Sequence, residues 1–193
     1  MRTLLSSVVA VVAVMASAQI GEASLYVDDF TWKEPHRFIS LGAATLAPFA
    51  FIRFCQRQPA DCKTPAASVD LVNMSAERWQ ELEDVNRAVN AAIIPREDGA
   101  NDVWSLSPTF GDCEDYALTK RHRLIRLGWP ASALRMAVAT TPEGRGHAVL
   151  VVRTSEGDLV LDNRVGRVRP YDQTDLALVK MQSGINPLFW NAI

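Results

Sequence analysis

The C-terminal half of the chain predicts one helix followed by three short strands, and this order limits the folds it can form. Asp112 is suited to begin a helix, and Gly128 followed by Trp129-Pro130 is suited to end it. Three aliphatic runs follow, separated by turns that contain glycine, at residues 135–140, 147–153 and 158–163. Such runs predict consecutive antiparallel strands. Helices followed by a strand meander indicate an α+β fold.

A second helix is predicted between Ser75 and Pro95. Ser75 suits the N-cap, apolar residues recur at helical spacing after it, and proline cannot continue the helix. Residues 24–65 contain four prolines, and we expect them to wrap around the core with one strand or short helix. After Pro170, we expect a modest helix at residues 174–181, with residues 186–190 packed on the surface of the core.

Cys113 lies in the run Gly-Asp-Cys-Glu-Asp-Tyr-Ala, in the first turn of the predicted helix. The helix dipole and the unpaired backbone N–H groups at this position lower the pKa of a thiol. The neighbouring acids Asp112, Glu114 and Asp115 would raise it unless His147 or a cation offsets them. Because an isolated cysteine is more often a small buried residue, this position alone leaves its role open.

His147 and Asp162 lie on two predicted strands joined by one turn. Side chains alternate along a strand, so a two- or four-residue turn would place Asp162 opposite Val149 or Val151, on the face that carries His147. A three- or five-residue turn would place Asn163 there instead. Taken singly, His147 and Asp162 read as a partly buried histidine and a residue at the end of a strand. Together with Cys113 they supply a nucleophile, a base and an orienting carboxylate.

The two other histidines, His36 and His122, lack a preceding glycine and a following apolar strand. His122 also lies among the cationic residues Lys120, Arg121 and Arg123 of the predicted helix. We therefore expect both histidines at the surface.

Residues 1–23 have the pattern of a secretory signal peptide. Residues 4–18 carry no charge, fall short of the ~20 residues that span a bilayer, and precede candidate cleavage sites after Ala18 and Ala23. An uncleaved anchor helix is the alternative. We expect residues 24–193 to form a single periplasmic or secreted domain without membrane insertion. With a net charge of −2 and no basic stripe, nucleic acid is not an expected partner.

The three cysteines of an exported chain leave one without a partner. Cys55 and Cys62 bracket a short polar loop that contains a proline, so we pair these two and expect Cys113 to be a free thiol. A zinc site is the alternative for the pair, but a second Cys or His pair is missing nearby.

The motifs around Cys113, His147 and Asp162, with the Cys55–Cys62 loop and Asp102-Val103-Trp104, resemble the bacterial transglutaminase-like cysteine proteinases. The resemblance extends over residues 54–171. It implies a papain-like or transglutaminase-like core in which the helix of Cys113 packs on an antiparallel sheet. It also implies that Cys113, His147 and Asp162 form a catalytic triad, which attacks an amide carbonyl and hydrolyses the resulting thioester with water. Backbone N–H groups near Cys113, with help from the loop of Trp104, would form the oxyanion hole.

The resemblance further implies a bound Ca²⁺ ion held by Asp112 and Glu114, which would neutralise the acids beside the thiol. Without a metal, these acids would only complement the helix dipole, by about 0.3–1 kcal/mol each. Family members often carry Thr-Pro-x-Glu after the tryptophan, whereas this chain has Ser107-Pro108-Thr109-Phe110. The resemblance therefore does not define the substrate groove of this chain, although it does define the triad.

The function predicted from the sequence is that of a periplasmic cysteine endopeptidase. Its protein substrate would be exported or attached to the cell surface, as in biofilms, and the periplasmic domain of an inner-membrane receptor is an implied partner. Two alternatives remain open. One is a transglutaminase or deamidase that acts on glutamine side chains, and the other is a binding module without catalysis.

Overall fold

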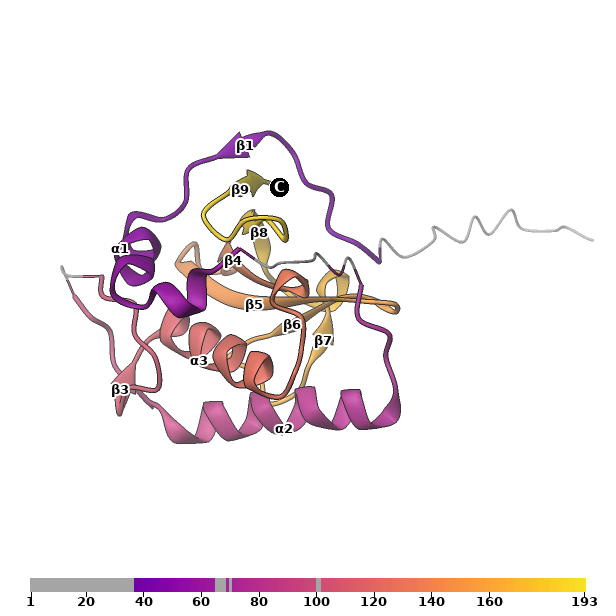
Figure 1. Cartoon of the computed structure of the whole chain (residues 1–193). Coiled ribbons are helices and arrows are strands. Elements are labelled where there is room, and N and C mark those ends of the chain that lie inside the picture. The colour runs from indigo at the N-terminus through magenta and orange to yellow at the C-terminus, as the bar shows by residue number, and fades with distance from the viewer. Residues whose placement is uncertain (1–36, 65–68, 70, 100–101) are drawn as a thin grey trace, which may run out of the picture. The chain divides into compact units, whose positions relative to one another are not determined.

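A seven-stranded antiparallel sheet lies at the centre of the fold in the computed structural model (Figure 1). Its strand order is β1-β9-β8-β4-β5-β6-β7, and every neighbouring pair is antiparallel. The strands are β1 (Ala44–Thr45), β4 (Leu134–Thr140), β5 (Gly146–Thr154), β6 (Gly157–Leu161), β7 (Arg169–Pro170), β8 (Ala177–Gln182) and β9 (Trp190–Ala192). The short strands β2 (Ile94–Pro95) and β3 (Phe110–Gly111) form a separate parallel pair.

The structure describes residues 37–64, 69, 71–99 and 102–193. They belong to one contact unit that begins at residue 35. The predicted signal peptide, its boundary at residue 23 and His36 lie outside the described residues. Within the described part of the chain, no helix combines the length and the apolar character needed to cross a bilayer.

Three α-helices accompany the sheet: α1 (Phe49–Arg57), α2 (Ala76–Ala92) and α3 (Cys113–Arg126). Helix α3 contacts β5 on one side and α2 on the other, so it forms the middle layer between the sheet and α2 (Figure 1). Short 3-10 turns follow at η1 (Pro59–Cys62), η2 (Ala131–Ala133) and η3 (Tyr171–Gln173). The predicted α+β arrangement of a Cys-bearing helix on an antiparallel sheet is confirmed.

The helices predicted after Ser75 and after Asp112 begin and end where their sequence signals place them. Ser75 Oγ accepts a hydrogen bond from the backbone N–H of Arg78 at 3.3 Å, as an N-cap does. Helix α3 starts at Cys113 and ends before Gly128, which has a φ of +88° that side chains with a Cβ rarely adopt. Cys113 is therefore the first residue of α3, and Asp112 is its N-cap.

The hairpin of β5 and β6 has a two-residue turn, which is one of the two lengths predicted to place Asp162 on the face that carries His147. Thr154 pairs with Gly157 and Leu150 pairs with Leu161, so the next position along places Asp162 opposite Val149. Alternation along β5 divides its side chains between two hydrophobic clusters. Leu150 and Val152 pack with the helices, whereas Val149 and Val151 pack on the other face. The prediction that Asp162 and His147 share a face is therefore confirmed.

The tail of the chain differs from its prediction. Residues 174–181 were expected to be helical, but Ala177–Gln182 form strand β8, which pairs with β4. Without this pairing, β4 would be an exposed sheet edge, so tertiary hydrogen bonding overrides a weak helical pattern. Trp190, expected at the surface of the core, lies in strand β9 and is 1% exposed.

The segment before α2 is held to the core by aromatic packing, and a disulfide links α1 to η1 within the segment. Phe51 of α1 packs edge-on against Trp190, with ring centroids 5.5 Å apart. Cys55 and Cys62 are bonded to each other and Cys113 is free, as predicted.

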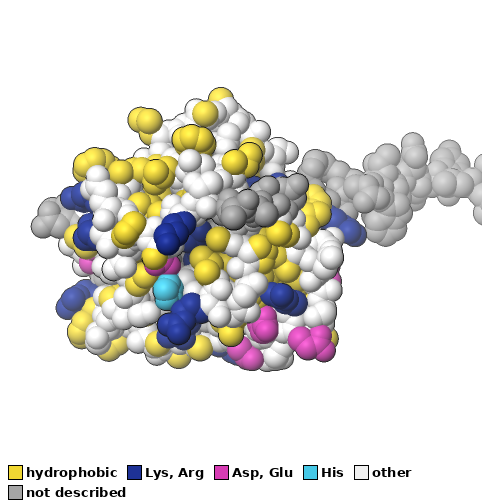
Figure 2. All heavy atoms as spheres, viewed as in Figure 1, with side chains coloured by type: hydrophobic (Ala, Val, Ile, Leu, Met, Phe, Trp, Pro, Cys, Tyr) yellow, Lys and Arg dark blue, Asp and Glu magenta, His cyan; other side chains and the backbone are white. Residues whose placement is uncertain are grey.

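Exposed hydrophobic side chains gather over β1, the start of α1 and the β8–β9 connection (Figure 2). Among them, Leu46 is 84% exposed and Phe49 is 74% exposed. This surface contains a hollow that is lined separately from the cleft beside Cys113.

Replacing Trp190 by alanine should lower the free energy of unfolding by about 3–5 kcal/mol, because it removes a buried ring that joins β9 to α1. Urea denaturation followed by circular dichroism measures this change. Phe189→Ala is the matched control, since Phe189 is 63% exposed and should cost about 0.5 kcal/mol or less. Equal losses in the two variants would contradict the assigned role of Trp190.

Candidate active site

Cys113 is the first residue of α3, and its sulfur lies against the start of β5. The backbone N–H of Ala148 donates a hydrogen bond to Cys113 Sγ at 3.2 Å. Because Ala148 directly follows His147, this contact fixes the helix start beside the histidine. The residues Cys113 and His147, 34 positions apart in the sequence, line the same cleft.

The position of the helix start is fixed by Gly111 and Asp115. A Cβ built on Gly111 would lie 2.3 Å from Asp115 Oδ2, so the glycine of the motif is required by the close approach of that side chain. Asp115 Oδ1 in turn accepts a hydrogen bond from the backbone N–H of Ser105 at 2.6 Å. Burial, followed by the charges of Asp112 and Asp98, raises the pKa of Asp115 to about 7. Asp115 thus joins the Cys113 helix to the loop that precedes it.

His147 and Asp162 form a buried pair, with Nε2 of the imidazole 2.8 Å from Asp162 Oδ1. Burial opposes ionisation of Asp162, but hydrogen bonds from His147 and from the backbone and side chain of Arg164 outweigh it and lower its pKa to about 2. An ionised carboxylate only accepts hydrogen bonds, so Nε2 carries the proton of the neutral ring. Nδ1 is then the nitrogen with a free lone pair.

The thiol of Cys113 faces an acid in this structure. It donates a hydrogen bond to Glu114 Oε2 at 3.3 Å. Burial and the charge of Glu114 raise the pKa of Cys113 to about 12, although the Ala148 N–H lowers it. The expected effect of the helix dipole is therefore outweighed by burial and by the flanking acids.

Three carboxylates gather beside the thiol: Asp98, Asp112 and Glu114 offer oxygens that all lie within 4.8 Å of one another. Burial and the neighbouring Asp112 raise the pKa of Glu114 to about 9. Asp112 occupies the N-cap position, but its side chain makes no capping hydrogen bond there. Its Oδ1 is buried without a hydrogen-bond partner among the described residues.

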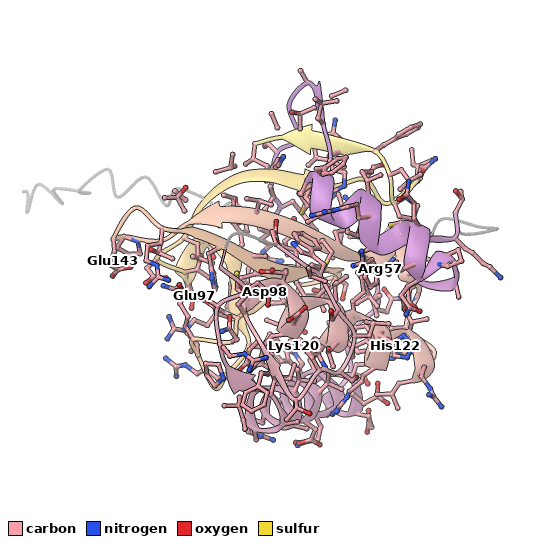
Figure 3. All side chains as sticks on the ribbon, turned by 90° about the vertical axis from the view of Figure 1, so that its left-hand side faces the viewer. Arg57, Glu97, Asp98, Lys120, His122 and Glu143 are labelled. Atoms are coloured by element: carbon pink, nitrogen blue, oxygen red, sulfur yellow. A yellow bond between two sulfur atoms is a disulfide. The ribbon has the colours of Figure 1, made fainter. Side chains whose placement is uncertain are left out.

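These residues lie in a cleft of about 730 Å³. One wall comes from the loop after β2, with Glu97 and Asp98, and another from the β4–β5 turn, with Glu143 and Arg145. An ion pair between Arg145 and Glu97 joins the two walls. Figure 3 shows Glu97, Asp98 and Glu143 on one side of the molecule, away from Arg57 and His122.

The comparison with family models agrees with this geometry. The model described as "Bacterial transglutaminase-like cysteine proteinase BTLCP" matches residues 41–193. The chain belongs to this family. The members of this family are described as transglutaminase-like cysteine proteinases.

Solved structures of one protein, LapG from Legionella pneumophila, are also similar to this family member. The EGTA-treated form is 30% identical over 53% of this chain and 61% of that chain, with a TM-score of 0.46. The calcium-bound form is 22% identical over 68% of this chain and 73% of that chain, with a TM-score of 0.49. The chain thus covers less than two thirds of the EGTA-treated structure. None of the curated proteins compared with the chain matches it.

The sequence did not single out two residues at the site of this family member. Asp98 belongs to the cluster of three carboxylates. It comes from a loop with several Asp and Asn residues, and the sequence pattern did not separate it from them. Arg164 contacts Asp162, and its position two residues after Asp162 was the available signal. The indole Nε1 of Trp104 donates to Asp102 Oδ1 at 2.8 Å, so this N–H is already used and does not point to an oxyanion.

Two of the cationic residues next to His122 on α3 are buried. Lys120 and Arg121 are 0% and 3% exposed. Arg121 donates to the backbone carbonyls of Leu134 and Asp61, which satisfies its buried guanidinium. His122 is 32% exposed, lies 2.7 Å from Asp61 and is not part of the cleft lining.

Replacing Glu114 by glutamine should make Cys113 more reactive in the presence of EGTA, because the variant removes a charge that raises the thiol pKa. The iodoacetamide alkylation rate at pH 9 should rise by roughly tenfold, as a shift of ~1 pKa unit implies. Asp172→Asn, at an exposed residue outside the cleft lining, is the control. An unchanged rate in the Glu114 variant would show that this carboxyl does not restrain the thiol.

Proposed function

We propose that this chain is a cysteine endopeptidase with Cys113, His147 and Asp162 as its catalytic triad. One observation carries the proposal: the sulfur is hydrogen-bonded to the residue after His147, while His147 is hydrogen-bonded to Asp162. A nucleophile and a base therefore line one cleft, and an orienting carboxylate contacts the base. Helix α3, strand β5 and the end of β6 each supply one of them.

The first half of the reaction uses the free nitrogen of His147. Nδ1 takes the proton of Cys113 when the thiol turns from Glu114 towards the ring, and Sγ then attacks the carbonyl carbon of the scissile amide. Backbone N–H groups at the start of α3 stabilise the oxyanion. The imidazolium, stabilised by Asp162, gives its proton to the leaving amine as the C–N bond breaks. An acyl group remains on Cys113 as a thioester.

Water completes the cycle through the same groups. His147 removes a proton from a water molecule, whose oxygen attacks the thioester carbonyl. The C–S bond breaks, the new C-terminal carboxyl leaves, and the proton returns to the thiolate. If an amine replaced water, the same thioester would give transamidation, so the product distinguishes hydrolysis from the transglutaminase alternative.

We also propose a calcium site formed by Asp98, Asp112 and Glu114. Calcium prefers carboxylate oxygens, and the residues fit it because Asp112 Oδ1 is buried without a partner among the described residues. A divalent cation there would supply positive charge beside the thiol, offsetting the acids that raise its pKa. Among the similar structures, one LapG is described as calcium-bound.

The location and partners of the enzyme are part of the same proposal. The signal-like pattern of residues 1–23 supports export to the periplasm. An exported or surface-attached protein, such as a biofilm component, would then be the substrate. The periplasmic domain of an inner-membrane receptor is the proposed regulator.

Cys113→Ser and His147→Asn should each abolish proteolysis, because each removes a group that forms or breaks bonds. Purified variants are incubated with the exported and surface protein fraction, and new N-termini are identified by mass spectrometry. His122→Asn is the matched histidine control and should cleave normally. New termini that persist with the Cys113 variant would refute the triad, and isopeptide or deamidated products without new termini would favour the transamidase.

Calcium should bind to the wild-type protein and raise its thermal midpoint, because ligand binding to the folded state stabilises it. Isothermal titration calorimetry measures the affinity for the ion directly. The double variant Asp112→Asn, Glu114→Gln should bind at least ~10-fold more weakly, since it removes two of the three charged ligands. Asp84→Asn, on the exposed face of α2, is the control. Equal affinity in all three proteins would place calcium elsewhere.

A further inference from the structure

Both carboxylate oxygens of Asp162 are held by the residue two positions later. Asp162 Oδ1 accepts a hydrogen bond from the backbone N–H of Arg164 at 2.9 Å, in addition to the contact with His147. Asp162 Oδ2 accepts from Arg164 Nε at 3.0 Å and lies 2.9 Å from an Nη atom of the same guanidinium. The carboxylate therefore cannot rotate without breaking a contact to Arg164.

Arg164 is itself fixed by Asp175, which precedes β8. One Nη atom lies 2.6 Å from Asp175 Oδ1 and the other lies 3.4 Å from Oδ2. Although Arg164 lines the cleft, its Nε and both Nη atoms are already engaged by carboxylates. The guanidinium is thus arranged to hold Asp162 rather than to bind a substrate.

Several other charged groups act on this pair. His147 faces Asp162 from β5, and Lys120 interacts with it electrostatically from α3. Glu143, from the β4–β5 turn, interacts electrostatically with Arg164. Lys120 Nζ is buried without a hydrogen-bond partner among the described residues, so it adds charge without fixing an orientation. The direct, directional contacts to Asp162 come from Arg164 and His147.

We propose that Arg164 is a positioning residue, which holds Asp162 so that its Oδ1 faces His147 Nε2 and keeps Nδ1 free for the thiol proton. This inference rests on the triad proposed above. Without the guanidinium, Asp162 Oδ2 would lose its partners in a site where burial favours the protonated carboxyl. The carboxyl could then turn, and the imidazole would lose the hydrogen bond that selects its tautomer.

The variant Arg164→Met tests this role, with Arg164→Lys as the conservative rescue and Arg167→Met as the control in the same loop. On a peptide that spans an identified cleavage site, Arg164→Met should lower kcat by about 10- to 100-fold with KM within about twofold. Arg164→Lys should recover part of the loss, and Arg167→Met should match the wild type. Asp175→Asn, which keeps Arg164 but removes a charge that holds it, should give a smaller loss.

A second readout is independent of substrate and of turnover. In ¹⁵N-histidine-labelled protein, long-range ¹H–¹⁵N spectra should show His147 as the Nε2–H tautomer in the wild type and a mixture in Arg164→Met. Arg164→Met with an unchanged tautomer and unchanged kcat would overturn the positioning role, even if Cys113→Ser is inactive. If no protein is cleaved by the wild type, the triad proposal fails, while the spectra still decide whether Arg164 orients His147. Should Arg164→Met not fold, the tautomer and kcat of Asp175→Asn and Arg164→Lys decide: wild-type values in both would overturn the role.

Discussion

The hydrogen bond from the Ala148 backbone to Cys113 Sγ is the contact on which the arrangement of the site depends. It joins the first residue of α3 to the third residue of the long central strand β5. A backbone donor belongs to the sheet, so its position is set by strand pairing and not by a side-chain rotamer. The helix above it is held by buried packing against the sheet and against α2. The site is thus built on rigid elements, with a loop supplying the acid Asp98.

Charge is the second constraint, and it acts against the reactivity that the family requires. Burial and Glu114 both disfavour the thiolate of Cys113, whereas Arg164 and His147 favour the ionised form of Asp162. Within the proposed triad, the pKa of Cys113 is therefore raised and the pKa of Asp162 is lowered. The contacts of Asp162 favour its charged carboxylate, whereas burial and Glu114 keep Cys113 in the thiol form.

Local signals in the sequence were sufficient for much of this structure. Ser75, Gly128 and the two-residue turn before Gly157 define their elements through short-range geometry, and the parity of β5 and β6 follows from it. Strand β8 was missed because its partner β4 lies about forty residues earlier, and short apolar runs suit helices and strands alike. Burial of Lys120 and Arg121 was missed for a similar reason, since Arg121 is satisfied by carbonyls of distant segments. Only the folded structure distinguishes Asp98 and Arg164 from the other charged loop residues.

The turn at Ser155 and Glu156 has a consequence for how this chain can vary. Surface turns usually accept insertions, because they carry few contacts. Here the pairing register that the turn sets determines which residue follows β6 on the face of His147. If an inserted residue shifted the pairing of β6 by one position, Asn163 would replace Asp162 opposite Val149. A change at this solvent-facing turn would then place an amide instead of a carboxylate beside the imidazole, without altering any residue of the site.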